Sequence, residues 1–196
     1  MSQELEIEFK NLLTKEEYDH LTNEFKLTGE HFTLQHNHYF DTKDFHLKES
    51  GCALRIREKN GKYELTLKQP VKEGLLETNQ QLSEEEANLV LSNTKIPEGE
   101  VRSIVQSVLP AASLLEHFGT LSTKRAEVEY MGGVLVFDNS LYLNCEDFEL
   151  EYEVKNRQAG EEIFIELLKT YEIPLRTTDN KIRRFFNEKV RQSGGK

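Results

Sequence analysis

The stretch Glu4-Leu5-Glu6-Ile7-Glu8-Phe9-Lys10 decides the fold class, because its charged and apolar side chains alternate strictly. Leu5, Ile7 and Phe9 fall on one side, and three glutamates and a lysine fall on the other. Successive side chains of a strand point to opposite faces, so a period of two indicates a β-strand. Residues 4–10 therefore predict a strand with one apolar face and one charged face.

The same alternation recurs along most of the chain. An Asn60-Gly61 pair, which is typical of a type I′ hairpin turn, follows residues 53–59 and leads into a return strand. We expect a break in that return strand at Pro70. Further strands are predicted over residues 34–42, 75–82, 120–130, 134–143 and 147–155, with a turn at Gly132-Gly133. The total is about eight strands, a number that can close into a barrel.

Helical signals lie between these strands. Thr14 with Glu17 and Ser83 with Glu86 are capping boxes that start two helices. Three more helices are expected over residues 100–109, 159–171 and 178–190. The fold class is therefore α+β. No linker interrupts the pattern, so we expect a single domain over residues 1–192 and a flexible C-terminal tail over residues 193–196.

Composition narrows the possible partners and location. The 196 residues include 25 Lys and Arg against 35 Asp and Glu, and the net charge of −10 argues against a nucleic-acid partner. The sequence shows no membrane segment of about 20 apolar residues and no signal peptide at its start. Cys52 and Cys145 lie far apart without a zinc-binding spacing. We therefore expect a cytoplasmic protein that contacts neither nucleic acid nor membrane.

The charged strand faces are sorted by sign. Residues 4–10 and 147–155 are rich in glutamate, whereas residues 53–59 are basic. Charged faces of an antiparallel sheet are most often solvated, and this alternative stays open for any one strand. Sorted faces also fit a polar barrel interior, with the apolar faces covered by helices outside. Such an interior needs water, metal ions or an anionic ligand to compensate its charges, and Mg²⁺ or Mn²⁺ with phosphate groups matches it.

Specific residues also follow one another in the order of a known family. They are Glu6-Ile7-Glu8-Phe9-Lys10, His38-Tyr39-Phe40-Asp41-Thr42, Leu54-Arg55-Ile56-Arg57, Glu64-Leu65-Thr66-Leu67-Lys68, Lys124-Arg125, Asp138, Glu149-Leu150-Glu151 and Asn180-Lys181. The first is similar to the ExExK signature of the CYTH superfamily of bacterial type, the triphosphate tunnel metalloenzymes. The resemblance runs from residue 4 to about residue 185. Asn180 stands where the family usually has serine, which leaves the part of that serine open.

The resemblance implies a fold and a set of site residues. The fold is an eight-stranded antiparallel closed β-barrel, or tunnel, with a polar, charged lumen and helices packed outside. The implied metal ligands for Mg²⁺ or Mn²⁺ are Glu6, Glu8, Asp138, Glu149 and Glu151. The implied triphosphate-binding cations are Lys10, Arg55, Arg57, Lys68, Arg125, Lys181 and Arg184. Lys10, Glu6 and Glu8 are also the expected catalytic residues, with Lys10 orienting or activating the attacking group.

Some assignments have alternatives. Glu64, Glu77 and Glu153 are possible further lumen residues, and the metal-binding pair is either Glu149/Glu151 or Glu151/Glu153. Arg184 fits a phosphate contact and a helix-surface charge equally.

Two features of residues 34–42 lie outside the assigned site. Tyr39 and Asp41 fall on one face of the predicted strand and can line the tunnel. His36 and His38 share the opposite face, but the sequence shows no third ligand for a transition metal.

Three functions fit the sequence. The first is metal-dependent hydrolysis of a small anionic triphosphate: inorganic tripolyphosphate, or a nucleoside or thiamine triphosphate. The second is a class IV adenylate cyclase that makes cyclic AMP and pyrophosphate. The third is a non-catalytic sensor that binds polyphosphate or a phosphorylated metabolite. Hydrolysis is the leading hypothesis. Both halves of the acidic set are present, which favours an enzyme over a sensor, and the oligomeric state stays open.

Overall fold

The computed structural model describes residues 2–72, 74–192 and 194. The predicted flexible tail, residues 193–196, lies outside these residues except for Gly194. The single domain over residues 1–192 stays a prediction. No helix in the described ranges is long and apolar enough to cross a membrane.

The described residues form the predicted closed, eight-stranded, antiparallel β-barrel. Neighbouring strands are hydrogen-bonded in the order β1-β5-β4-β3-β2-β6-β7-β8, and β8 pairs with β1. The strands are β1 (Ser2–Leu13), β2 (Thr33–Thr42), β3 (Ala53–Lys59), β4 (Lys62–Val71), β5 (Gly74–Leu82), β6 (Leu115–Tyr130), β7 (Gly133–Tyr142) and β8 (Cys145–Val154).

Two helices, α1 (Lys15–Glu24) and α3 (Glu84–Asn93), begin directly after the capping residues predicted for them, Thr14 and Ser83. The backbone N–H of Glu17 donates to Thr14 Oγ1 and that of Glu86 donates to Ser83 Oγ, and each glutamate accepts from its capping residue in return. A short 3₁₀ turn (Gly29–His31) and the one-turn helix α2 (His46–Glu49) were not predicted, because they are too short to show a helical period. The helices are α1 (Lys15–Glu24), α2 (His46–Glu49), α3 (Glu84–Asn93), α4 (Glu100–Val108), α5 (Arg157–Thr170) and α6 (Lys181–Gln192).

The chain divides into two compact units. The first unit comprises the described residues within 1–6 and 35–121, and the second comprises those within 7–34 and 122–196. Strands β1 and β6 each begin in the first unit and end in the second.

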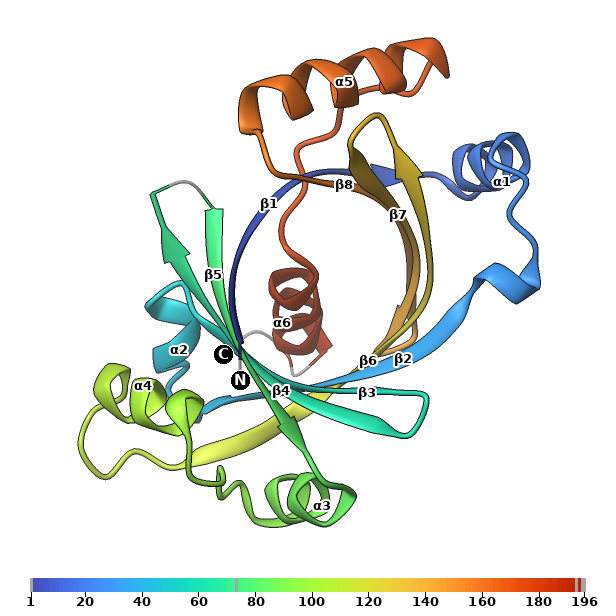
Figure 1. Ribbon diagram of the computed structural model, residues 1–196. Coiled ribbons are helices and arrows are strands. Elements are labelled where there is room, and N and C mark those ends of the chain that lie inside the picture. The colour runs from blue at the N-terminus through green and yellow to red at the C-terminus, as the bar shows by residue number, and fades with distance from the viewer. Residues whose placement is uncertain (1, 73, 193, 195–196) are drawn as a thin grey trace. The chain divides into compact units, whose positions relative to one another are not determined.

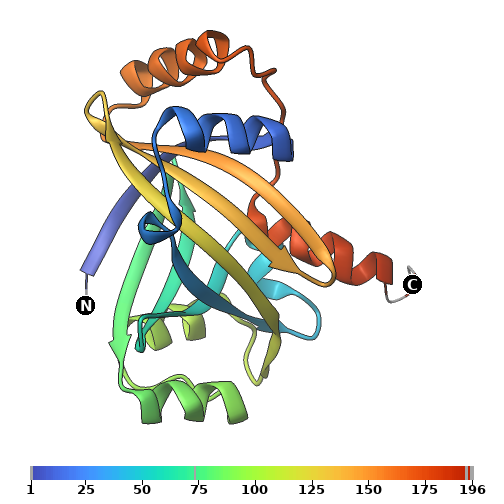
Figure 2. The same ribbon diagram turned by 90° about the vertical axis from the view of Figure 1, so that its right-hand side faces the viewer.

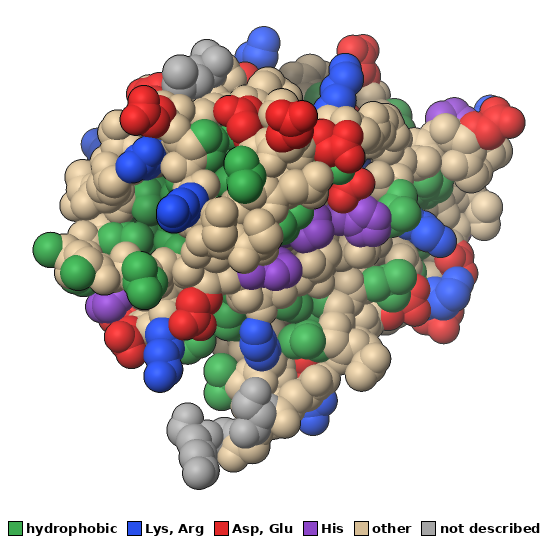
Figure 3. All heavy atoms as spheres, turned by 90° about the horizontal axis from the view of Figure 1, so that it is seen from below, with side chains coloured by type: hydrophobic (Ala, Val, Ile, Leu, Met, Phe, Trp, Pro, Cys, Tyr) green, Lys and Arg blue, Asp and Glu red, His purple; other side chains and the backbone are tan. Residues whose placement is uncertain are grey.

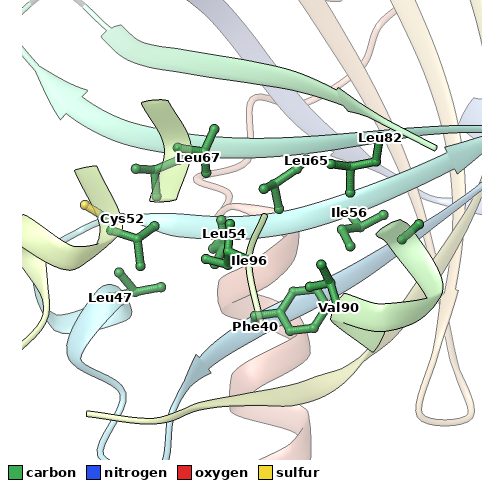
Figure 4. Close-up of a cluster of buried hydrophobic side chains, with 13 residues drawn as sticks. Phe40, Leu47, Cys52, Leu54, Ile56, Leu65, Leu67, Leu82, Val90 and Ile96 are labelled. Carbon is green, nitrogen blue, oxygen red and sulfur yellow. The ribbon is translucent and has the colours of Figure 1, made fainter. Parts of the chain in front are cut away.

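The core of the first unit lies between apolar strand faces and helices. Figure 4 shows Leu54 and Ile56 of β3 and Leu65 and Leu67 of β4 packed with residues of α2 and α3 such as Leu47 and Val90. Helices α3 and α4 lie against β4 and β5 (Figure 1). Each of the four strand residues is at most 1% exposed, and burial of such a side chain stabilises the fold by about 1.5–3 kcal/mol.

The core of the second unit has the same design. The apolar sides of β7 and β8, which carry Phe137 and Leu150, pack with Leu21 of α1 and Phe164 of α5. Both α1 and α5 lie against β8 (Figure 2). In each unit, helices therefore cover the apolar faces of the strands, and the charged faces point away from these cores.

Two local predictions were wrong. Strand β4 does not break at Pro70, which pairs with Leu75 of β5. The pairing of β4 with β3 ends at Lys68, so the strand tolerates a residue without an N–H beyond that point. The turn between β6 and β7 lies at Met131-Gly132, one residue before the predicted Gly132-Gly133. Gly133 belongs to β7, where a Cβ would come within 2.6 Å of the Glu153 carbonyl oxygen.

Candidate active site

The charged strand faces carry buried charges, so the solvated-face alternative is wrong for their central residues. In the second unit, Asp138, Glu149 and Glu151 are 0%, 1% and 5% exposed. In the first unit, Arg55 is 9% exposed. Buried charges are costly unless they are paired or bound to a ligand, so their partners define what the faces can do.

In the second unit, one row of charged residues runs across three strands. Arg125 of β6 lies opposite Asp138 of β7, which lies opposite Glu149 of β8. Arg125 donates from Nε and Nη2 to the two oxygens of Asp138, at 2.8 and 2.6 Å. Its Nη2 also donates to Glu151 Oε2 at 2.8 Å. The register of the strands therefore converts separate sequence positions into one ion-pair network.

Three carboxylates of this network converge on one position. Asp138, Glu149 and Glu151 each offer an oxygen, and these atoms lie within 4.8 Å of one another. The Lys181 ammonium contacts all three and lies 2.9 Å from Asp138 Oδ2. Oxygen donors in this number suit a hard divalent cation, so the set fits Mg²⁺ or Mn²⁺. This grouping favours Glu149/Glu151 over Glu151/Glu153, because Glu153 is more exposed and lies 3.9 Å from Arg125.

Helix α6 supplies two of the cations. Lys181 is its first residue, and Arg184 follows one turn later. Arg184 donates from Nη1 to Glu149 Oε2 at 2.6 Å and from Nε to Asp147 Oδ2 at 2.9 Å. Its Nη2 is buried and has no hydrogen-bond partner among the described residues. Arg184 thus places a positive charge beside the carboxylates of β8, and its Nη2 can donate to a further acceptor.

Asp147 is a site residue that the sequence analysis missed. It accepts from Arg184 and from the Tyr142 hydroxyl. The signal was available, since Asp147 continues the alternation of Glu149 and Glu151 along β8.

Burial and charge set the protonation of this centre. Burial, together with the neighbouring Glu151, raises the pKa of Glu149 above its ordinary value. Burial opposes the charge of Lys181, but Asp138, Glu151 and Glu149 outweigh it and hold the pKa of Lys181 well above its ordinary value. Lys181 is therefore a permanent cation near neutral pH. Of the three converging carboxylates, Glu149 takes up a proton most readily, because it alone has a raised pKa.

Strand β1 places Glu8 and Lys10 in the second unit. Their side chains form an ion pair, and Lys10 lies opposite Glu151 of β8. Burial opposes the charge of Lys10, but the carboxylates of Glu8, Glu151 and Glu149 raise its pKa above the ordinary value. Lys10 is therefore a cation near neutral pH, and its part in catalysis stays a prediction. Glu8 is not one of the three carboxylates that converge in the acidic centre, so its role as a metal ligand stays a prediction.

In the first unit, Lys68 links two glutamates. Its ammonium lies 2.7 Å from Glu6 Oε2 and 2.5 Å from Glu77 Oε1. Burial opposes ionisation of Glu77, but Lys68, Arg55 and Arg57 outweigh it and lower the pKa of Glu77 to about 2. Glu77 is therefore a carboxylate held ionised by the basic residues of β3 and β4, and its place in the lumen stays a prediction. Glu6 pairs with Lys68, and its role as a metal ligand stays a prediction.

The other two predicted phosphate-binding cations of the first unit, Arg55 and Arg57, lie on β3. Arg57 donates from Nε to Asn37 Oδ1 at 3.2 Å, and Asn37 was missed because amides carry no charge pattern. Arg57 also lies opposite Glu64 of β4, and Glu64 accepts from Gln81.

Asp41 has a structural task. Its two oxygens accept from the backbone N–H groups of Thr42, Leu47 and Lys48. The bonds to Leu47 and Lys48 hold the start of α2. The expectation that Asp41 lines the tunnel stays a prediction.

Comparison with known proteins identifies the family to which this chain belongs. The CYTH domain family model matches residues 4–186, and the chain belongs to this family. The chain is 49% identical over 189 residues to "Putative triphosphatase YjbK" of Bacillus subtilis strain 168, covering 96% of this chain and 98% of YjbK.

Two solved structures share the fold. A "putative adenylate cyclase" from Bacillus halodurans is 46% identical, with a TM-score of 0.91 over 95% of this chain and 100% of that one. HpAC1 from Hippeastrum, whose name reports a dominant triphosphatase activity, is 24% identical, with a TM-score of 0.77 over 94% and 96% of the two chains. At that identity, HpAC1 supports the fold alone.

Proposed function

We propose that this protein is an enzyme that hydrolyses a small triphosphate with the help of Mg²⁺ or Mn²⁺. The observation that carries the proposal is the convergence of Asp138, Glu149 and Glu151 on one cation position, within a network of arginines and lysines. The family and the name of the Bacillus subtilis relative support the same activity.

The chain's own cations account for recognition of the substrate. Arginine forks and lysine ammonium groups match phosphate oxygens. In the second unit, Arg184 has a buried donor without a partner, and Lys10, Arg125 and Lys181 are held in place by carboxylates. In the first unit, Arg55, Arg57 and Lys68 are the proposed phosphate-binding residues, as the family resemblance implies.

The acidic centre accounts for the need for a metal. A bound divalent ion would neutralise phosphate charge and lower the pKa of a coordinated water. Asp138, Glu149 and Glu151 would hold it, and Lys181 would then give up its contacts and become available to phosphate. Because the pKa of Lys10 is raised, we assign Lys10 to orienting the reacting groups by charge.

The test is phosphate release from tripolyphosphate, thiamine triphosphate and ATP, each with Mg²⁺, Mn²⁺ or EDTA. We expect metal-dependent release that is lost in Glu6→Gln and Glu151→Gln. Glu166→Gln is the matched control, because its side chain is 74% exposed on α5. Triphosphate binding without any metal-dependent product would overturn the proposal and favour a sensor.

A second candidate is an adenylate cyclase, which the name of the Bacillus halodurans relative favours. Product analysis with ATP separates the two activities. ADP and phosphate support hydrolysis, whereas cyclic AMP and pyrophosphate support cyclisation. A cytoplasmic location and the absence of nucleic-acid and membrane partners stay predictions from the sequence.

A further inference from the structure

Three histidines and a glutamate gather on the outer side of the first unit. His36 and His38 lie on β2, Glu58 on the neighbouring β3 and His117 on β6, the other neighbour of β2. Figure 3 shows histidine side chains together near the middle of one face, beside acidic side chains. The sequence shows no third histidine beside His36 and His38, and the pairing of β2 with β6 brings His117 next to His38.

His38 has two of the other side chains as neighbours. The rings of His38 and His117 have centroids 5.8 Å apart. His38 Nε2 lies 3.8 Å from Glu58 Oε2, and His36 is directly opposite Glu58 in the β2–β3 register. Neighbouring nitrogen and oxygen ligands of a tetrahedral zinc lie about 3.4 Å apart, given zinc–ligand bonds of about 2.0–2.2 Å. The 3.8 Å separation is too long for a hydrogen bond and near this ligand spacing. The ligand atoms of the four residues do not all lie within 4.8 Å of one another, so a bound metal would require their side chains to rotate toward it.

The surroundings of His38 point to a ligand at its Nε2. Its Nδ1 lies 2.8 Å from Thr120 Oγ1, and the hydroxyl accepts in this pair when Nδ1 carries the ring proton. The Nδ1–H tautomer leaves the lone pair on Nε2, an atom that is buried and has no hydrogen-bond partner among the described residues. Histidines that bind metals typically donate their other ring N–H to such an acceptor, which orients the ring.

We propose that His36, His38, His117 and Glu58 form a second metal site, for a transition metal such as Zn²⁺, on the outer side of the first unit. Imidazole nitrogens suit zinc, whereas the all-carboxylate centre of the second unit suits Mg²⁺ or Mn²⁺. Two histidines at i and i+2 of one strand, with a third from its neighbour, give three ligands on one face. The protein therefore carries two metal sites that differ in ligand chemistry.

Zinc binding, measured by calorimetry with excess Mg²⁺ to occupy the carboxylate centre, tests the proposal. We expect one Zn²⁺ per chain to bind at this site, and His117→Gln and His36→Gln to abolish that binding. Thr120→Val should weaken it by about 10- to 100-fold, because the valine cannot orient the His38 ring. His20→Gln is the matched control, because His20 is an exposed histidine of α1 in the second unit.

Nuclear magnetic resonance of the histidine rings gives a second readout. Zinc should shift the ring nitrogens of His36, His38 and His117, with Nε2 as the coordinating atom of His38, and leave those of His20 unchanged. Unchanged thermal unfolding of the variants without zinc shows that they are folded. Equal zinc affinity in His117→Gln and the intact protein, or an absence of shifts in the three rings, would overturn the proposal.

Discussion

The ammonium of Lys181 lies 2.9 Å from Oδ2 of Asp138, a carboxylate with no exposed surface. Because Glu149 and Glu151 contact the same ammonium, the chain provides its own cation at the position that suits a divalent metal. A metal bound there has to displace Lys181. The first residue of α6 therefore couples the acidic centre to the helix that carries Arg184.

Replacing Lys181 should make the stability of the protein depend on metal. Lys181→Met leaves three buried carboxylates without one of their cations, and loss of one partner of a buried ion pair costs about 3–5 kcal/mol. We expect a lower melting temperature without metal and a larger rise on adding Mg²⁺ than in the unaltered protein. Lys169→Met, at a side chain that is 70% exposed, is the control for thermal unfolding. An equal response of both variants to Mg²⁺ would contradict this role of Lys181.

Metal binding should weaken as the pH falls. The pKa of Glu149 is raised by burial and by Glu151, so the metal-free protein binds a proton there more tightly than the unfolded chain does. That group contributes stability below its ordinary pKa of 4.5, and the contribution is lost as the pH rises through the raised value. A metal needs the ionised form, so its stabilising effect should be larger at pH 7 than at pH 5. Melting temperatures with and without Mg²⁺ measure this difference, and Glu149→Gln should reduce it.

Loss of Glu77 should destabilise the protein at neutral pH and have less effect in acid. Its pKa is lowered from 4.5 to about 2, so the stability that it contributes is present above 4.5 and is lost as the pH falls through about 2. A shift of this size corresponds to about 3 kcal/mol. Urea unfolding of Glu77→Gln at pH 7 and at pH 2 should show a difference from the unaltered protein at the higher pH alone. A difference of the same size at both would mean that packing, and not charge, holds Glu77.

Arg57→Ala should reduce turnover of the triphosphate substrate. Removal of one positioned donor to a transition-state charge costs about 100-fold in kcat. Arg57→Lys keeps the charge but not the planar fork, and we expect an intermediate loss. Arg102→Ala, at a half-exposed side chain of α4, controls for loss of an arginine. Steady-state phosphate release by the variants measures the effect, and activity of Arg57→Ala equal to that of Arg102→Ala would remove Arg57 from the site.

Asp41→Ala should lower stability without changing substrate affinity. Its carboxylate accepts from the backbone N–H of Thr42 and from two N–H groups at the start of α2, and loss of a helix cap costs about 0.5–2 kcal/mol. Chemical denaturation and the KM for the triphosphate are the two measurements. A raised KM with unchanged stability would contradict this prediction and show that Asp41 contributes to substrate binding.

Local sequence patterns are enough to predict the strands and most of the helices. The alternation in residues 4–10 predicts β1, residues 53–59 coincide with β3, and Thr14 and Ser83 start α1 and α3 as their capping boxes indicate. These signals are local, because a strand face or a capped turn is set by residues within a few positions of one another. The family resemblance added the closed barrel and the candidate ligands.

The tertiary structure alone decided which charges meet. The ion pair of Arg125 with Asp138 and the contact of Lys181 with three carboxylates join residues far apart in the chain, through strand register and through α6. The same holds for His117, which reaches His38 because β6 is the neighbour of β2. Alternation shows which side chains share a face of one strand. Strand order and burial determine the partners of that face, and these depend on the packing of the whole chain.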